Sequence, residues 1–161
     1  MTKITIEEVK KLREKTGAPV IECRNALRQA LRLRAQGRVA QGDEKKAIEI
    51  LRKKGLERAA KKKERETKAG VVASYIHADQ TKGATVILST ETDFVARHPD
   101  FQKLAQEIAM QVTAMEPKDI KELLEQNWIR DDQKTIQALI DESIAKFGEN
   151  IKVEEFKRFA V

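Results

Sequence analysis

The side chains able to do covalent chemistry are few and far apart in this sequence. The chain has 161 residues but only two histidines, His77 and His98, and a single cysteine, Cys23. Cys23 falls on the apolar face of a predicted helix, where a buried thiol is unreactive. No spacing of residues matches a zinc site, a glycine-rich phosphate loop or a nucleophile elbow. We therefore expect no catalytic residues, no bound metal and no cofactor. We also expect that the protein is not an enzyme.

One segment, TETDFVAR, combines residue types that suit contact with another protein. It follows a predicted strand, so the turn after that strand would carry Asp93 and Phe94 to a tip of the fold. An aromatic ring there could enter an apolar cleft of a partner, while the neighbouring carboxylate perturbs ions nearby. In the alternative, Asp93 caps a short helix while Phe94 and Val95 fill the local core. The pattern alone leaves both interpretations open.

The N-terminal part of the chain predicts three helices. Thr5 and Glu8 have the spacing of a capping box, and apolar residues recur at helical spacing in three successive stretches. Asp43 is suited to cap the third helix and Gly55 to end it. Three short helices around one apolar cluster indicate a compact module over residues 1–55.

A basic segment follows this module. Residues 52–68 hold nine lysines and arginines against three glutamates, an excess equal to the net charge of +6 of the whole chain. The segment could contact RNA or an acidic protein surface, or form a solvated helix, and we interpret residues 56–69 as a basic helical linker. An RNA-binding or ribosome-associated adaptor is thus the alternative function. However, no aromatic residue is available there to stack on bases, so we expect no direct contact with nucleic acid.

The C-terminal part, residues 70–161, predicts an α+β core. Side chains alternate over residues 71–77 and 84–90 with a polar turn between them, which indicates an antiparallel hairpin. Another strand is expected near the C-terminus, where its alternation slips as at a β-bulge or an edge. Helices fill the stretch between, and Asp131 or Asp132 is expected to cap the last of them. The predicted sheet is three-stranded and antiparallel.

The composition of the chain indicates the compartment in which the protein works. Hydrophobic residues make up 40% of the chain and charged residues 36%, which is typical of a helix-rich globular protein. We find no signal-peptide pattern and no apolar run long enough to cross a bilayer, so we expect no membrane partner. A single cysteine fits a reducing compartment. The sequence predicts a cytoplasmic protein.

Five separated segments, in the expected order, resemble the elongation factor Ts family. The TDFVA in the fourth is the most recognisable motif of that family. The five segments are KKLREKTGAPVIECRNAL, GDEKKAIEILRKKGLERAAKK, GVVASYIH, STETDFVARHPDFQKLAQEIAMQV and IAKFGENIKVEEFKRF. The resemblance implies an N-terminal module like a ubiquitin-associated domain, and a translation factor that accelerates GDP release from the GTPase elongation factor Tu so that GTP can rebind.

The resemblance also implies which residues meet the partner. In the family, the TDF tip enters the nucleotide domain of the GTPase near its magnesium site. Carried over, Asp93 and Phe94 form the wedge, and Thr92, Val95 and Arg97 shape it. The N-terminal module of the family touches the same domain, and the matching positions here are Leu12, Val20 and Ile21.

The sequence departs from the family pattern at three places. Residues 28–42 are longer than the usual connection between the second and third helices, and Pro19 replaces a usual glycine. The middle section of the family is nearly absent after Pro117, which leaves a single core with an unpartnered sheet. We therefore expect a homodimer through this core, as shorter members are thought to form. A further alternative is a purely structural module whose three helices bind a peptide or a ubiquitin-like protein.

Overall fold

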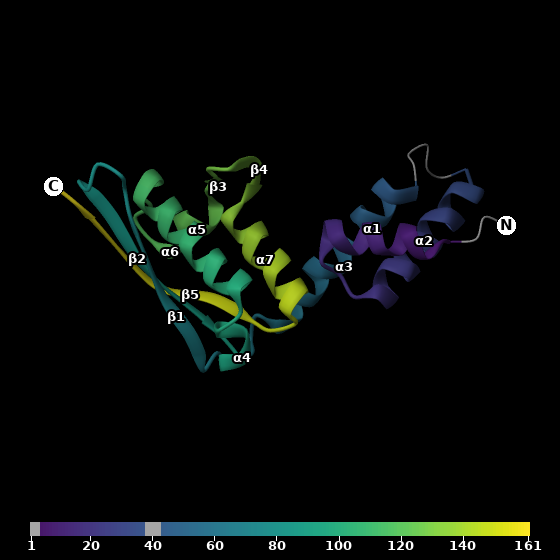
Figure 1. Ribbon diagram of the computed structural model, residues 1–161, viewed down its shortest axis with the longest axis horizontal. Helices are drawn as coiled ribbons and strands as arrows, with labels where there is room; N and C mark the ends of the chain where they lie inside the picture. Colours follow the sequence, from purple (N-terminus) through teal and green to yellow (C-terminus); the bar gives the residue numbers. More distant parts are fainter. Residues whose placement is uncertain (1–3, 38–42) are drawn as a thin grey trace. The chain divides into compact units, whose positions relative to one another are not determined.

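The computed structural model describes residues 4–37 and 43–161, which form two compact units (Figure 1). The first unit extends to Arg58 and the second begins at Ala59. Each has its own cluster of buried apolar side chains. The division falls inside a helix, so residues 56–69, the expected linker, are shared between the end of that helix and the chain leading into the sheet.

The first unit contains three helices around a small apolar core. They are α1 (Ile6–Thr16), α2 (Val20–Ala35) and α3 (Asp43–Lys62). The predicted capping box is present, because the hydroxyl of Thr5 accepts the N–H of Glu8 and the carboxylate of Glu8 accepts the N–H of Thr5. Leu12, Cys23 and Leu27 are among the buried residues.

Helix α3 does not end at Gly55, so that prediction is wrong. It continues to Lys62 because residues 56–62 are strong helix formers. In addition, a glycine inside a helix costs only about 1 kcal/mol. Ala59, on this last part, is fully buried in the core of the second unit. Tertiary packing of Ala59 thus supports the helix beyond the glycine.

The second unit is built on a three-stranded antiparallel sheet in the order β1-β2-β5. Its strands are β1 (Ala69–Ile76), β2 (Lys82–Thr90) and β5 (Ile151–Ala160). The register between β2 and β5 shifts because Ile87 pairs with Glu155 and Leu88 with Val153, which leaves Glu154 as the extra residue of a β-bulge. The irregularity expected in the last strand is therefore a bulge.

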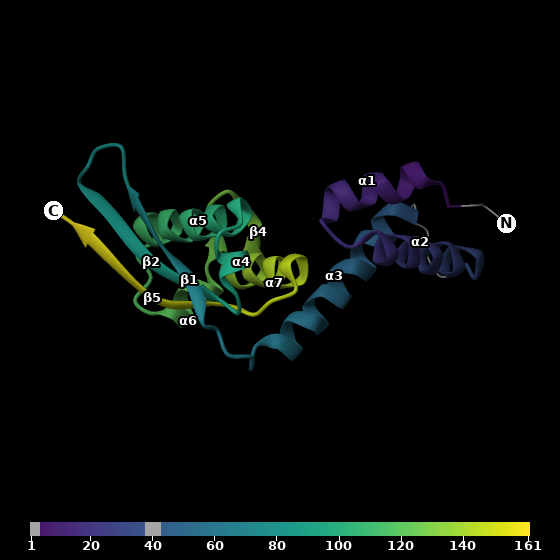
Figure 2. The same ribbon diagram turned by 60° about the horizontal axis from the view of Figure 1, so that its bottom comes forward.

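One face of this sheet is covered by helices. They are α5 (Pro99–Met115), α6 (Ile120–Glu125) and α7 (Ile136–Phe147), which pack on the same side in both views (Figures 1 and 2). Ala84, Val86 and Leu88 alternate towards these helices and are buried, together with Phe101 and Ile108 of α5. On the opposite face of the same sheet, apolar side chains remain exposed; they are Val72, Ile76, Ile87 and Phe159.

A small hairpin that we did not expect precedes α7. It consists of β3 (Asn127–Trp128) and β4 (Asp131–Thr135), so Asp131 and Asp132 both lie in strand β4, and neither caps the helix. The cap is Thr135, whose hydroxyl accepts the N–H of Ala138 at 3.1 Å. Threonine and aspartate cap helices by the same hydrogen bond, so the pairing of β4 with β3 decides between them.

Within the residues described, no helix is both long enough and apolar enough to cross a membrane.

Candidate protein-binding site at the end of strand β2

The segment after β2 lies at the open end of the hairpin. Thr90, the last residue of β2, pairs with the first residue of β1, Ala69, and with the first residue of β5, Ile151. The turn that joins β1 to β2 is at the other end of these strands. Helix α4 (Asp93–Ala96) therefore stands at an end of the core where three elements converge (Figure 1). It is a tip of the core, but it is not the turn of a hairpin.

Helix α4 presents its aromatic side chain to solvent. Phe94 is 85% exposed, whereas the next two residues, Val95 and Ala96, are buried in the core of the unit. The hydroxyl of Thr92 caps the helix by accepting the N–H of Val95 at 3.5 Å. The structure thus combines parts of the two interpretations of this segment: Val95 fills the local core and Phe94 points outward, and Thr92, not Asp93, caps the helix.

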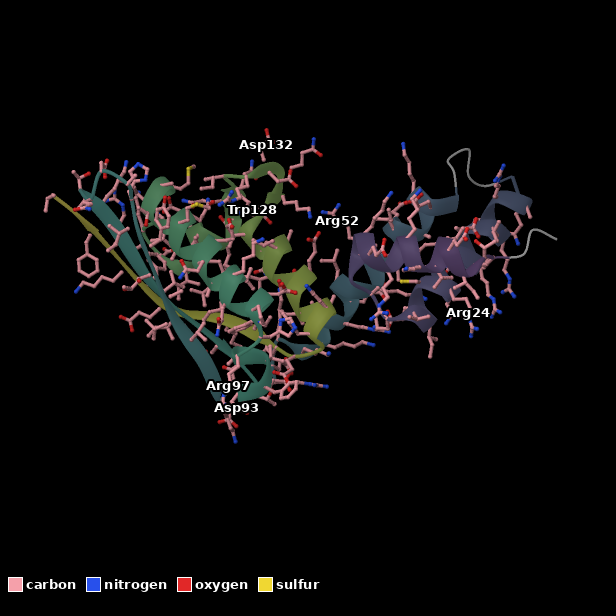
Figure 3. All side chains as sticks on the ribbon, in the orientation of Figure 1. Arg24, Arg52, Asp93, Arg97, Trp128 and Asp132 are labelled. Carbon is pink, nitrogen blue, oxygen red and sulfur yellow. The ribbon has the colours of Figure 1, made fainter. Side chains whose placement is uncertain are left out.

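A charged pair flanks the exposed ring. The guanidinium of Arg97 lies 3.1 Å from the carboxylate of Asp93, and both side chains project away from the body of the unit (Figure 3). Both are largely exposed, so the pair contributes only about 0.3–0.5 kcal/mol to the helix. A partner could therefore separate these charges at low cost.

Glu149, which comes much later in the sequence, holds the turn that leads into α4. One oxygen of this carboxylate, Oε2, accepts the Thr90 hydroxyl at 2.9 Å and the Thr92 N–H at 3.0 Å. The other, Oε1, accepts the Thr92 hydroxyl at 2.7 Å. Three hydrogen bonds from two threonines thus end on one side chain.

The next residue, Asn150, ties the same turn to the chain before β1. Its N–H donates to the carboxylate of Glu91 at 2.7 Å, and its side-chain amide donates to the carbonyl of Arg65 at 2.6 Å. The guanidinium of Arg65 returns to Glu91 at 3.5 Å. Residues 90–92 are therefore enclosed by contacts from the loop between α7 and β5.

Sequence reasoning missed Glu149 and Asn150. They follow the αL glycine that ends α7, Gly148, and so look like an ordinary loop after a helix. Their partners lie almost 60 residues earlier, and no local pattern connects the two segments. One signal in the sequence could have suggested the contact: this loop comes just before the last strand, and that strand pairs with β2.

His98 and Cys23 have structural surroundings. His98 caps α5, where its Nδ1 accepts the N–H of Asp100 at 3.2 Å, and its ring meets Phe147 edge-on at 5.2 Å between centroids. The thiol of Cys23 donates to the carbonyl of Ala18 at 3.4 Å, and burial raises its pKa. Across residues 4–37 and 43–161, no group of three metal-ligating side chains comes together.

The candidate residues of the first unit differ in exposure. Val20 is 49% exposed and Ile21 65%, so both lie on its surface at the start of α2. Leu12 is fully buried in the core of the unit. The expectation that Leu12 contacts a partner is therefore corrected: its side chain supports the helices from within.

The candidate site has the properties of a surface that acts on another macromolecule: one exposed ring, one carboxylate and a short helix fixed by buried supports. Comparison with known proteins identifies the family. A family model described as Elongation factor TS matches residues 91–161. Proteins named Elongation factor Ts are similar over nearly the whole chain in Thermosipho melanesiensis (37% identical, 98% of each chain) and Thermodesulfovibrio yellowstonii (39% identical, 98% of this chain and 96% of the relative).

The chain belongs to the elongation factor Ts family. It is accordingly a guanine nucleotide exchange factor of translation, with elongation factor Tu as its partner. The relatives differ in length. The alignment with the Thermosipho protein spans 203 positions for this chain of 161 residues, and the Aquifex aeolicus relative (42% identical) is covered over only 52% of its length. The relatives therefore have residues without a counterpart here.

Proposed function

We propose that this chain accelerates GDP release from elongation factor Tu by inserting Phe94 into the nucleotide domain of the GTPase, with Asp93 beside it. The observation that carries the proposal is a phenylalanine that is 85% exposed on a helix whose next two residues are buried. An exposed ring on a fixed support needs little rearrangement before it enters a cleft. Thr92 caps the helix that carries the wedge. Val95 anchors this helix in the core, and Arg97 pairs with Asp93.

The mechanism requires only linkage between two binding events. A protein that binds the nucleotide-free GTPase more tightly than the GDP-bound form must weaken GDP binding by the same factor. A thousandfold faster release corresponds to a barrier lower by about 4 kcal/mol. Burial of the Phe94 ring supplies about 2–3 kcal/mol of this. The charge of Asp93 near the magnesium and phosphate sites would supply the remainder.

The experiment is release of a fluorescent GDP analogue from the GTPase, with and without the factor. Phe94→Ala is expected to slow stimulated release by about 30- to 150-fold, the factor that corresponds to 2–3 kcal/mol. Ile129→Ala is the matched control, because Ile129 is also an exposed apolar residue of the second unit and lies on another element. Normal exchange by a folded Phe94→Ala variant would remove Phe94 from the mechanism.

We propose a supporting role for the first unit. Its three helices fit the expected module like a ubiquitin-associated domain, and Val20 and Ile21 form an exposed apolar pair at the start of α2. This pair offers a second contact with the nucleotide domain of the GTPase. Membership in a family of translation factors also supports a cytoplasmic location for this protein.

The open face of the sheet supports a homodimer. Val72, Ile76 and Phe159 are exposed there, and a hollow of about 490 Å³ lies beside the last two. Glu155 and Lys157 are on the same face and carry opposite charges, so they can pair across a twofold axis. A second copy of this chain therefore offers a self-complementary cover.

The RNA-binding alternative is not favoured. At least five of the nine basic residues between 52 and 68 have protein acceptors; they are Arg58, Lys62, Lys63, Arg65 and Lys68. Four of these contacts reach beyond the segment, one within the first unit and three within the second. These contacts give the basic segment a structural role that does not require binding to the phosphate backbone of RNA.

A further inference from the structure

We propose that Glu149 is a positioning residue for nucleotide exchange, because its carboxylate sets the turn from which Phe94 projects. This inference rests on the proposed function of Phe94. Glu149 lies outside the TDFVA motif and comes 55 residues after Phe94 in the sequence. Its action would be indirect: it contacts Thr90 and Thr92, and does not touch the ring.

The carboxylate determines how Thr92 caps the helix. An ionised carboxylate only accepts hydrogen bonds, so the Thr92 hydroxyl must donate its proton to Glu149 Oε1, at 2.7 Å. A lone pair of the same hydroxyl then remains for the N–H of Val95. The second oxygen of Glu149 takes the backbone N–H of Thr92. Glu149 thus fixes both the backbone and the side chain of the capping residue.

Helix α4 depends on such support because it is short. Four residues form a single turn, and a single turn is unstable in isolation. Phe94 cannot hold the turn, since its ring is exposed, and the Asp93–Arg97 pair is too exposed to do so. The position of the ring is therefore determined by the cap at Thr92 and by the buried side chains of Val95 and Ala96.

Glu149 is itself held in place on both sides. Before it, Gly148 adopts the αL conformation that ends α7, and its carbonyl accepts the ammonium of Lys62. After it, the Asn150 amide donates to two carbonyls of the chain that leads into β1. The contacts are also reciprocal: Glu149 accepts from Thr92, while Glu91 accepts from the N–H of Asn150. A carboxylate that is itself fixed can hold the turn; a free one could not.

A double-mutant cycle on the full chain tests this role. Glu149→Ala removes all three hydrogen bonds, and a single hydrogen bond to a charged group already corresponds to about a tenfold change, so we expect stimulated GDP release to slow at least about tenfold. In the Phe94→Ala background, the same substitution should slow release less than about twofold, because the ring that it positions is already absent. Glu125→Ala is the matched control, since Glu125 is an exposed glutamate of the same unit.

The outcomes separate the inference from the function on which it rests. Normal exchange by Glu149→Ala, or a tenfold slowing that persists without Phe94, would overturn the positioning role. Normal exchange by Phe94→Ala alone would instead overturn the wedge itself. If Glu149→Ala is unfolded at the assay temperature, Glu149→Gln decides through the same cycle. Its amide keeps one acceptor oxygen, so it should slow release by a smaller factor, again only when Phe94 is present.

Discussion

Phe94 and Val95 are adjacent, and one turn of helix sends their side chains in opposite directions. The ring of Phe94 is in solvent, while Val95 packs against the sheet as part of the core. The two residues therefore contribute to different properties of the molecule. We therefore propose that Phe94 serves recognition and adds little to folding, whereas Val95 contributes to stability.

This division predicts opposite results from two neighbouring alanine substitutions. Val95→Ala should lower the free energy of unfolding by about 1–3 kcal/mol, because it removes buried methyl groups and leaves a cavity. Phe94→Ala should change it by less than about 0.5 kcal/mol, as for other exposed positions. Urea unfolding followed by circular dichroism measures both. Equal losses for the two variants would contradict the orientation of α4.

Residue patterns could not predict these orientations. The motif contained every residue of the proposed wedge, and Thr92 caps its helix. The turn that leads into this helix is held by hydrogen bonds from Glu149 and Asn150, which cross almost 60 residues of sequence. Short-range periodicity carries no information about such contacts.

At the scale of elements, local signals identified most helices and strands but misplaced two boundaries. The capping box of α1 was read correctly, because it acts within a few residues. Gly55 does not end α3, since packing of Ala59 outweighs its helix-breaking tendency. Asp131 does not cap α7, because it pairs with Trp128 in a hairpin. The first error arose where a tertiary contact outweighed a local preference, and the second where a short local hairpin was not recognised.

The true cap of α7 makes a prediction for that helix. Thr135→Ala removes the hydroxyl that accepts the Ala138 N–H and should lower the free energy of unfolding by about 1 kcal/mol. Thr135→Ser keeps the hydroxyl and is the matched control, expected to lose less than half as much. Urea unfolding of both variants is the measurement. An unchanged Thr135→Ala variant would mean that the cap does not contribute.

At the scale of the whole molecule, we propose that copies of the chain associate through the open face of the sheet. The face follows from the alternation of β1 and β2: one set of side chains meets the helices, and the other set has no cover within its own unit. Apolar surface of this kind favours association, and the sequence indicated it through the lack of a middle section after Pro117. The sheet itself was predicted with its three strands and antiparallel order.

A charge placed on that face should prevent dimerisation. Val72→Lys would bury an unpaired ammonium in a twofold interface, so we expect the dissociation constant to rise at least about a hundredfold. Ala114→Lys places the same charge on an exposed position of α5 and should leave the dimer intact. Analytical ultracentrifugation over a range of concentrations distinguishes the two states. A wild-type chain that stays monomeric at high concentration would remove the dimer proposal altogether.

The loop that holds the turn into α4 follows that turn by almost 60 residues, and this has a consequence for biosynthesis. The TDFVA motif leaves the ribosome well before Glu149 and Asn150 are synthesised. A nascent chain therefore has the motif before it has the residues that orient it. Full activity should begin only once Asn150 has left the ribosome, so a fragment ending before Gly148 would display the motif without a rigid mounting.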